Sequence, residues 1–286
     1  MSFIASRKLI YILSLLIIIP GLLSLCWPGR DALNCGIDFK GGSVIDVKFN
    51  KMVPSNAVRD VLEQFNLNKD AQIQKCGTNE MIIKTRDLSP NESNLLTKAL
   101  QQKFGNVQIL RNDKVGPVFG RELAMKAVYS VLIACALTLI YITVRFEFKF
   151  GVGAIIALLH DVLVILGVFS ILRLEIDSSF VAAVLTVLGY SVMDTIVVFD
   201  RIRENMSQAR KESYETIVDR SIMQTLNRSI NTALTVVICL AALLIFGGAT
   251  IKTFIIALLI GVISGCYSSV FVASPIWYDL KMRDTN

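Results

Sequence analysis

The chain has 286 residues, of which 53% are hydrophobic, and its mean hydropathy is +0.58. Six separated apolar runs approach the length of about 20 residues that a membrane-spanning helix needs, which excludes an ordinary soluble protein. The net charge of +6 does not indicate nucleic-acid binding, because no basic run is interleaved with aromatic residues. The sequence therefore predicts a polytopic α-helical membrane protein.

The first apolar run follows Arg7 and Lys8 and covers about residues 9–27. It is longer than the apolar region of a typical signal peptide, and no small-residue cleavage site follows it. We interpret residues 1–27 as a cytoplasmic N-terminus and an uncleaved first transmembrane helix.

Residues 28–126 form the one large polar segment, and their patterns predict four strands and two helices. The second helix begins with a capping box made by Ser89 and Glu92, with Pro90 at its first position. The expected order of elements is β-α-β-β-α-β, which is that of a ferredoxin-like α+β domain. This fold hosts many functions and identifies none by itself.

A glycine-rich run, Gly36-Ile37-Asp38-Phe39-Lys40-Gly41-Gly42, stands just before the first predicted strand. Glycine permits positive φ, so we interpret the run as a structural loop that returns the chain from the membrane to the sheet. Val115-Gly116-Pro117 and Gly120 are expected to interrupt the chain before the second membrane helix. Cys35 and Cys76 are candidate disulfide partners, although sequence alone cannot place their sulfur atoms.

Residues 127–276 hold the other five predicted helices, with a charged, helical cytoplasmic connection at about residues 200–225. Residues 277–286 form a cytoplasmic tail. Lys and Arg concentrate in the short loops on the N-terminal side, so both termini are predicted to be cytoplasmic and the polar domain extracytoplasmic. The helices are predicted at residues 127–144, 151–172, 180–199, 226–246 and 253–273.

One ionisable residue, Asp194, lies in the apolar part of the fourth helix, about 10 Å inside Arg201 along the axis. A carboxylate at bilayer depth costs about 2.5–3.5 kcal/mol on insertion scales, so it is normally protonated, paired or turned inward. Asp194 is therefore a candidate titratable site in an ion or proton path. The alternative is a protonated aspartate that only hydrogen-bonds a neighbouring helix.

Two further polar residues, His160 and Asp161, lie near the middle of the third helix. Neighbours on a helix point about 100° apart, so both cannot face the same partner. They are expected either to belong to a relay or to fix helix packing. Asp161 and Asp194, on consecutive helices, also suggest an alternative function, that of an intramembrane aspartyl protease, in which two aspartates share a proton. The residues 191–193 before Asp194 lack the Gly-x-Gly pattern of such proteases.

The fifth helix carries a polar face on an otherwise apolar surface, and this face is expected to point into the helix bundle. An ionised Asp194 could pair with the arginine of this face if the fourth and fifth helices are neighbours. The face consists of Arg228, Asn231, Thr232 and Thr235.

Several longer motifs, taken together and in order, resemble the SecF family of bacterial protein-export subunits, which belongs to the RND superfamily. Two positions depart from the family pattern, since Met193 and Met223 stand where Asn is usual. The resemblance covers nearly the whole chain. It rests on the glycine-rich run, Val115-Gly116-Pro117, Leu159-His160-Asp161-Val162, Gly189-Tyr190-Ser191, the run from Asp194 to Glu204, and Gln224-Thr225-Leu226 with Arg228.

The resemblance implies pairing with the related subunit SecD and work with the SecYEG channel, with YajC as a further candidate partner. It implies that proton motive force promotes the late export of unfolded polypeptide, with Asp194 and Arg228 on the proton path. Neither a catalytic constellation nor a metal or cofactor motif is found. The alternatives are a purely structural subunit and one half of an RND-type exporter, whose outer region would be larger than about 100 residues.

Overall fold

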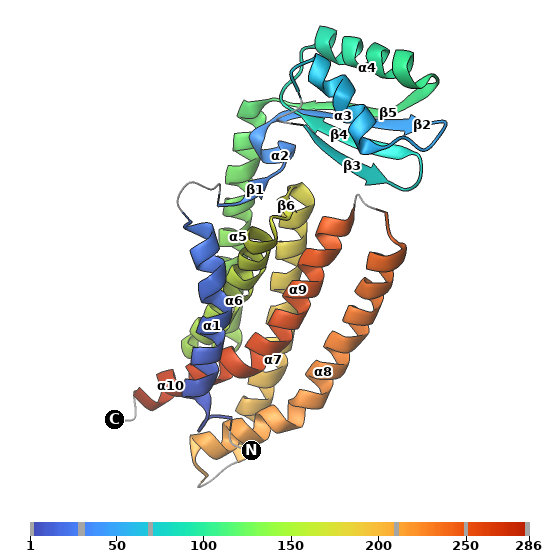
Figure 1. Ribbon diagram of the computed structural model, residues 1–286. Helices are drawn as coiled ribbons and strands as arrows, with labels where there is room; N and C mark the ends of the chain where they lie inside the picture. Colours follow the sequence, from blue (N-terminus) through green and yellow to red (C-terminus); the bar gives the residue numbers. More distant parts are fainter. Residues whose placement is uncertain (1–2, 28–31, 68–70, 209–211, 249–250, 284–286) are drawn as a thin grey trace.

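The computed structural model describes residues 3–27, 32–67, 71–208, 212–248 and 251–283. Within these residues, six helices are long and apolar enough to cross a membrane, as predicted. They run roughly side by side, and an α/β domain stands at one end of the bundle (Figure 1). The six are α1 (Arg7–Leu25), α5 (Pro117–Arg145), α6 (Phe148–Leu172), α7 (Ser178–Gln208), α8 (Tyr214–Phe246) and the continuous run Lys252–Arg283.

The last of these helices has three parts, which are α9 (Lys252–Ser268), the π-helical turn η2 (Ser269–Ala273) and α10 (Ser274–Arg283). The helix therefore runs past the predicted end at residue 273, and most of the predicted tail, residues 277–286, is helical. Trp277 is fully buried and stacks on Phe150 at a ring-centroid distance of 4.6 Å. This apolar contact holds α10 against α6.

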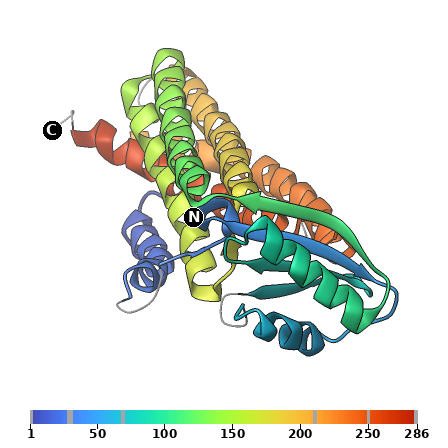
Figure 2. The same cartoon turned by 90° about the horizontal axis from the view of Figure 1, so that it is seen from above.

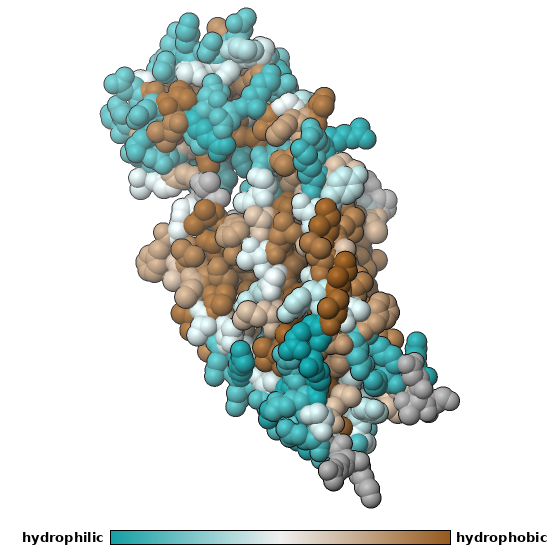
Figure 3. All heavy atoms as spheres, turned by 180° about the vertical axis from the view of Figure 1, so that it is seen from behind, coloured by the Kyte–Doolittle hydropathy of each residue, from teal (hydrophilic) through white to brown (hydrophobic). Residues whose placement is uncertain are grey.

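The bundle has inner and outer helices. α6 and α9 bury many residues, whereas α5 buries only Gly120 and Ile142 among its described residues. The face in Figure 3 shows a band of hydrophobic side chains around the helices, with hydrophilic residues at both ends. This distribution is what a chain crossing a bilayer requires, because only apolar side chains are compatible with the hydrocarbon layer.

The α/β domain contains a four-stranded antiparallel sheet with the strand order β3-β4-β2-β5. Helices α3 and α4 cover one face of the sheet, as the view from above in Figure 2 shows. Alternate residues of β2, such as Ile45 and Val47, are fully buried beneath them. The elements follow the predicted order: β2 (Gly42–Phe49), α3 (Ser55–Gln64), β3 (Gln72–Cys76), β4 (Glu80–Thr85), α4 (Pro90–Phe104) and β5 (Val107–Val115).

The predicted capping box at the start of α4 is confirmed. The Ser89 hydroxyl accepts a hydrogen bond from the Glu92 backbone N–H, and the Glu92 carboxylate accepts one from the Ser89 N–H. Both bonds satisfy backbone donors that the first turn of a helix leaves free.

The glycine-rich run differs from the predicted loop, because it contains the short helix α2 (Ile37–Lys40). The prediction of a chain break at Gly120 is wrong, because α5 already begins at Pro117 and Gly120 lies inside it. A Cβ atom at Gly120 would stand 2.8 Å from the Phe39 carbonyl oxygen. Gly120 therefore serves the close approach of α2 to α5 instead of a chain break.

Two short segments that sequence analysis missed form a second, two-stranded sheet. β1 (Asn34–Cys35) pairs in parallel with β6 (Glu175–Ile176), which lies between α6 and α7. None of the six cysteines, all of which lie within the described residues, forms a disulfide, so the candidate disulfide between Cys35 and Cys76 is not formed. The connection predicted at residues 200–225 is mostly an extension of α7 and α8, and Asn205 joins the two helices by hydrogen bonds to Ser221 and Gln224.

Candidate functional site: two carboxylates in the helix bundle

Asp194 lies on α7, and its half-buried carboxylate is held by two serine hydroxyls from other parts of the bundle. Ser229 of α8 donates to one carboxylate oxygen at 2.6 Å, and Ser269 of η2 donates to the other. Hydrogen bonds from hydroxyl groups to a charged acceptor are among the stronger ones in proteins. The structure thus supplies Asp194 with donors but with no cation among the described residues.

Arg228 does not pair with Asp194, although α7 and α8 pack against each other as the pairing hypothesis required. The side chain of Arg228 is exposed, and the structure gives its guanidinium no partner among the described residues. The reason is helical geometry: Ser229 follows Arg228 directly, so the two side chains point about 100° apart. The residue that reaches Asp194 is Ser229.

The polar face of α8 likewise points outward, which corrects the expectation that it lies inside the bundle. Arg228, Asn231 and Thr235 are exposed, and Thr232 is half-buried. The hydroxyls of Thr232 and Thr235 donate back to carbonyl oxygens of the same helix at 2.8 Å. This outward polar face of α8, made by these four residues, therefore remains available to a neighbouring molecule.

Asp161 is the second carboxylate of the bundle, and it is completely buried. Three serine hydroxyls donate to it, from Ser191 of α7 at 2.7 Å and from Ser264 and Ser268 of α9 at 2.6 and 2.8 Å. Because Asp161 itself belongs to α6, this one side chain ties three helices together. A buried carboxylate needs such donors, since an unsatisfied one would be strongly destabilising.

His160, the neighbour of Asp161, turns to a different part of the bundle, as the 100° rule predicts. Its ring packs beside Tyr267 at a centroid distance of 5.8 Å, and its Nδ1 lies 3.2 Å from Asp161 Oδ1. Its Nε2 is buried and has no hydrogen-bond partner within the described chain. The geometry favours a packing role for His160 and a crosslinking role for Asp161.

The two carboxylates are linked through neighbouring serines on one turn of helix. Ser268 donates to Asp161, and the next residue, Ser269, donates to Asp194. On α7, Ser191 and Asp194 are three residues apart, so the two sites occupy successive turns. No hydrogen bond joins the carboxylates directly in the part of the chain described, and they do not form the proton-sharing pair that an aspartyl protease needs.

Sequence reasoning missed the serines that bind these two carboxylates. Ser264 and Ser268 lie four residues apart on an otherwise apolar helix, and that spacing was the available signal. Gly261 and Gly265 lie on the same helix. Gly261 packs against Val187, and Gly265 packs against Ser191, which lets α9 approach α7 closely enough for the serines to reach Asp161. The missed serines are Ser191, Ser229, Ser264, Ser268 and Ser269.

Comparison with known proteins identifies the family. Residues 95–283 match the family described as "Protein export membrane protein SecD/SecF, C-terminal", and residues 33–51 match the family described as "SecD/SecF GG Motif". The chain belongs to the SecD/SecF family. The second match covers the glycine-rich run and β2, so the run is a family signature as well as a structural element.

Individual relatives of this SecD/SecF chain cover nearly all of it. A "Protein translocase subunit SecF" from Thermobaculum terrenum is 44% identical over 97% of the chain and 93% of the relative. A "Protein translocase subunit SecDF" from Bacillus subtilis is 38% identical over 99% of the chain, but the chain covers only 38% of that relative.

A crystal structure of SecDF from Thermus, titled a translocon-associated membrane protein, superposes with a TM-score of 0.87 at 34% identity. It covers 99% of this chain, which spans 39% of that longer protein. At the two positions where the SecF pattern usually has Asn, Met193 and Met223 are exposed by 55% and 54%. The hydrogen bonds of Asp194 are therefore supplied by serines and do not depend on these positions.

Proposed function

We propose that this chain is the SecF-type subunit of a proton-driven accessory complex of the Sec translocase. It promotes late steps of protein export across the bacterial plasma membrane together with SecD and SecYEG. Family membership and the names of the relatives support the export role. The observation that carries the proton-driven part is Asp194, a carboxylate inside an apolar helix whose hydrogen-bond donors within the described chain are two serines.

A carboxylate bound by hydroxyl groups can exist in either protonation state. When ionised, it accepts a hydrogen bond from each serine; when protonated, it donates one, and a serine hydroxyl rotates to accept it. The ionised form costs about 2.5–3.5 kcal/mol at bilayer depth, and the serine donors offset part of this. One charge moved through 100 mV supplies about 2.3 kcal/mol, which shifts a balanced equilibrium about fifty-fold.

The outward polar face of α8 supports a partner subunit in the membrane. An exposed arginine and asparagine on an apolar helix are unfavourable in contact with lipid. A second set of helices that covers this face would provide polar groups to Arg228 and would place that guanidinium beside the α7–α8 pair. We propose that SecD is this partner, which is consistent with relatives named SecDF in which one longer chain includes the matching region. YajC is a further candidate.

We also propose that the α/β domain is a ferredoxin-like domain on the extracytoplasmic side. Its strand order and its two helices on one face support the fold assignment. The described ends of the chain lie at the opposite end of the bundle from the domain (Figure 1), so a cytoplasmic location of the termini places the domain outside. The excess of Lys and Arg in short loops at that opposite end supports this orientation. The domain would there meet emerging unfolded polypeptide.

The proposal assigns a transport role and no catalytic one, in agreement with relatives named as translocase subunits. Asp161 then serves as a structural crosslink beside a titratable Asp194. A purely structural subunit is the rival function, and it differs in a measurable way: it does not need Asp194 to change protonation.

The test is gradient-dependent translocation of a reporter polypeptide into inverted membrane vesicles that contain the whole complex with SecD and SecYEG. Asp194→Asn and Arg228→Ala are each expected to abolish the increment that ΔpH and membrane potential produce, with complex assembly unchanged. Asp200→Asn is the matched control, because Asp200 lies on the same helix but is exposed, at 3.7 Å from Arg145. An undiminished increment in Asp194→Asn vesicles would show that Asp194 is structural and that the coupling site lies in SecD or at His160 and Asp161.

A further inference from the structure

The glycine-rich run has no role in the proton-driven mechanism proposed above, yet it attaches the α/β domain to the N-terminal end of α7. We define the GG segment as residues 33–42. Its β1 pairs in parallel with β6, and the Gly36 N–H donates to the Ile176 carbonyl oxygen at 2.8 Å. The Asn34 side chain donates to the Arg173 carbonyl oxygen at 3.1 Å. The GG segment then continues directly into β2, an inner strand of the domain sheet.

The N-terminus of α7 is bound by two carboxylates of different origin. Asp177 is the local cap, and its Oδ1 accepts hydrogen bonds from the Phe180 N–H at 3.0 Å and the Ser179 hydroxyl at 2.6 Å. Asp38 comes from the GG segment, and its Oδ2 accepts from the Ser178 N–H at 2.9 Å and the Ser178 hydroxyl at 2.6 Å. Free N–H groups and the helix dipole favour negative charge there, so both carboxylates stabilise the helix start.

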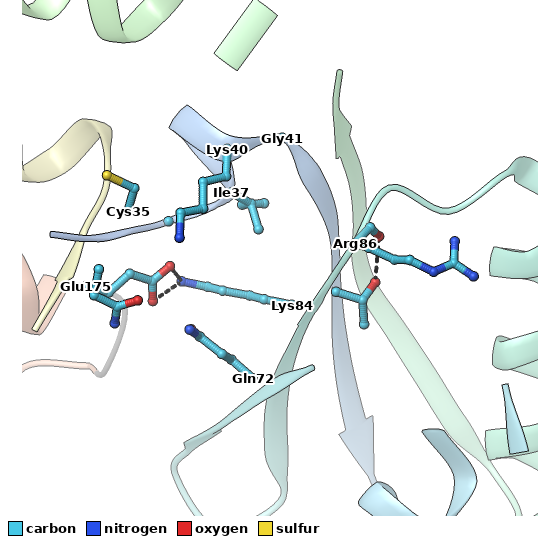
Figure 4. A pocket seen from close by; sticks show the side chains of 11 residues that line it. Cys35, Ile37, Lys40, Gly41, Gln72, Lys84, Arg86 and Glu175 are labelled. Carbon is cyan, nitrogen blue, oxygen red and sulfur yellow. Dashed lines mark hydrogen bonds and ion pairs between the residues drawn. The ribbon is translucent and has the colours of Figure 1, made fainter. Parts of the chain in front are cut away.

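A third contact joins the sheet itself to the same place. Lys84 of β4 lies 2.8 Å from both carboxylate oxygens of Glu175, which belongs to β6. Both side chains are only 17% exposed, so water screens this ion pair less than one at the surface. Figure 4 shows the pair beside Cys35 and Ile37 of the GG segment, at the wall of a cleft of about 250 Å³.

Two glycines of the segment permit its close approach to β4 and to the start of α5. A Cβ atom at Gly42 would stand 2.4 Å from the Thr85 carbonyl oxygen, and one at Gly41 would stand 2.8 Å from the Pro117 backbone. Both residues also have positive φ, at +151° and +80° respectively. Among the described residues, the domain is therefore attached to α5 through the chain at Pro117 and through the packing of α2, and it is attached non-covalently to α7.

We infer that Asp38, with the Lys84–Glu175 pair, clamps the α/β domain to α7, so that the domain follows any displacement of α7 relative to α5. Ser178 and Asp194 are 16 residues apart on one uninterrupted helix, or about 24 Å along its axis. A rigid helix carries a displacement over this distance. The inference rests on the proposed function, in which Asp194 drives the motion, and it assigns Asp38 and Lys84 as positioning residues.

The first experiment compares Asp38→Ala with Asp177→Ala in the complete complex in vesicles. Each variant removes one capping carboxylate from α7, but only Asp38 connects the domain. We expect Asp38→Ala to lose most of the gradient-dependent increment in translocation and Asp177→Ala to retain it. Asp38→Asn should restore function, because asparagine also accepts hydrogen bonds at a helix start. Equal effects of Asp38→Ala and Asp177→Ala would overturn the inference.

The second experiment measures domain position independently of export. Spin labels on unnatural amino acids at Gln64 of the domain and Lys252 at the start of α9 report the distance between domain and bundle. Loss of the Asp38 interaction should lower the ratio of domains docked on α7 to domains released from it about fivefold. The distance distribution should therefore broaden in Asp38→Ala but not in Asp177→Ala. An unchanged distribution in Asp38→Ala would also overturn the inference.

A charge exchange completes the test. Lys84→Glu and Glu175→Lys should each broaden the distance distribution and reduce the gradient-dependent increment in translocation. The double variant should restore the narrow distribution and the increment. If it restores neither, the ion pair does not hold the domain. Asp194→Asn separates the two proposals. If it retains the increment, the proposed proton site fails, while the distance measurements still decide whether the clamp exists.

Discussion

Replacement of Asp161 should weaken the helix bundle more than replacement of the partly buried Asp194. Asp161→Ala leaves three serine hydroxyls without their acceptor in a fully buried position. Each lost buried hydrogen bond costs about 1–3 kcal/mol, but serines on helices can bond instead to a carbonyl one turn back. Ser268 already lies 3.3 Å from the Gly265 carbonyl oxygen. The expected net loss is therefore about 2–5 kcal/mol.

The assay is thermal unfolding of the purified complex in nanodiscs, with Asp161→Ala, Asp161→Asn and Asp194→Asn side by side. A loss of 2–5 kcal/mol corresponds to a fall of roughly 5–15 °C in apparent Tm for a chain of this size. Asp161→Asn should lose less, because its amide keeps one acceptor oxygen in place. The reasoning is refuted if Asp161→Ala has the same apparent Tm as the wild type, or if the apparent Tm of Asp194→Asn falls further than that of Asp161→Ala.

Two further predictions concern other parts of the chain. Hydrogen bonds from the Ser89 backbone and from Arg86 lower the pKa of Glu92 to about 2. The contribution of Glu92 to the stability of α4 is therefore present above its ordinary pKa of 4.5 and is lost as pH falls towards 2. Glu92→Gln should make unfolding of the domain, followed by circular dichroism, less sensitive to acid over this range. Gly167→Val should separate α1 from α6, because a Cβ atom at Gly167 would stand 2.8 Å from the Gly21 Cα. We expect the assembled complex to be lost on native gels. A variant that still assembles would contradict this close helix crossing.

Local signals predicted most of the fold. Apolar runs of spanning length gave the membrane helices, and alternation, periodicity and a capping box gave the elements of the domain in their observed order. These signals lie within short stretches of chain, so no tertiary information was needed. The predictions failed where a distant segment decides the structure, as at Gly120, which meets the Phe39 carbonyl oxygen inside a helix.

The candidate site was predicted only in part. Asp194 and Asp161 were identified because an ionisable residue in an apolar helix is conspicuous wherever its partners lie. The partner expected for Asp194 was Arg228, on charge alone, and the structure provides Ser229 and Ser269 instead. Serine is small, uncharged and common in membrane helices, so its hydrogen bonds leave little trace in a hydropathy pattern.

The sequence by itself determined the class of protein, the number of membrane spans and the two aspartates within them, because hydrophobic length and buried charge are properties of single segments. Only the tertiary structure decided which side chains contact those aspartates. It also decided that the glycine-rich run binds the N-terminal end of α7. These contacts join residues as many as 140 positions apart, as with Asp38 and Ser178. They depend on helix rotation and on close backbone approach, and neither can be read from the spacing of residues along the chain.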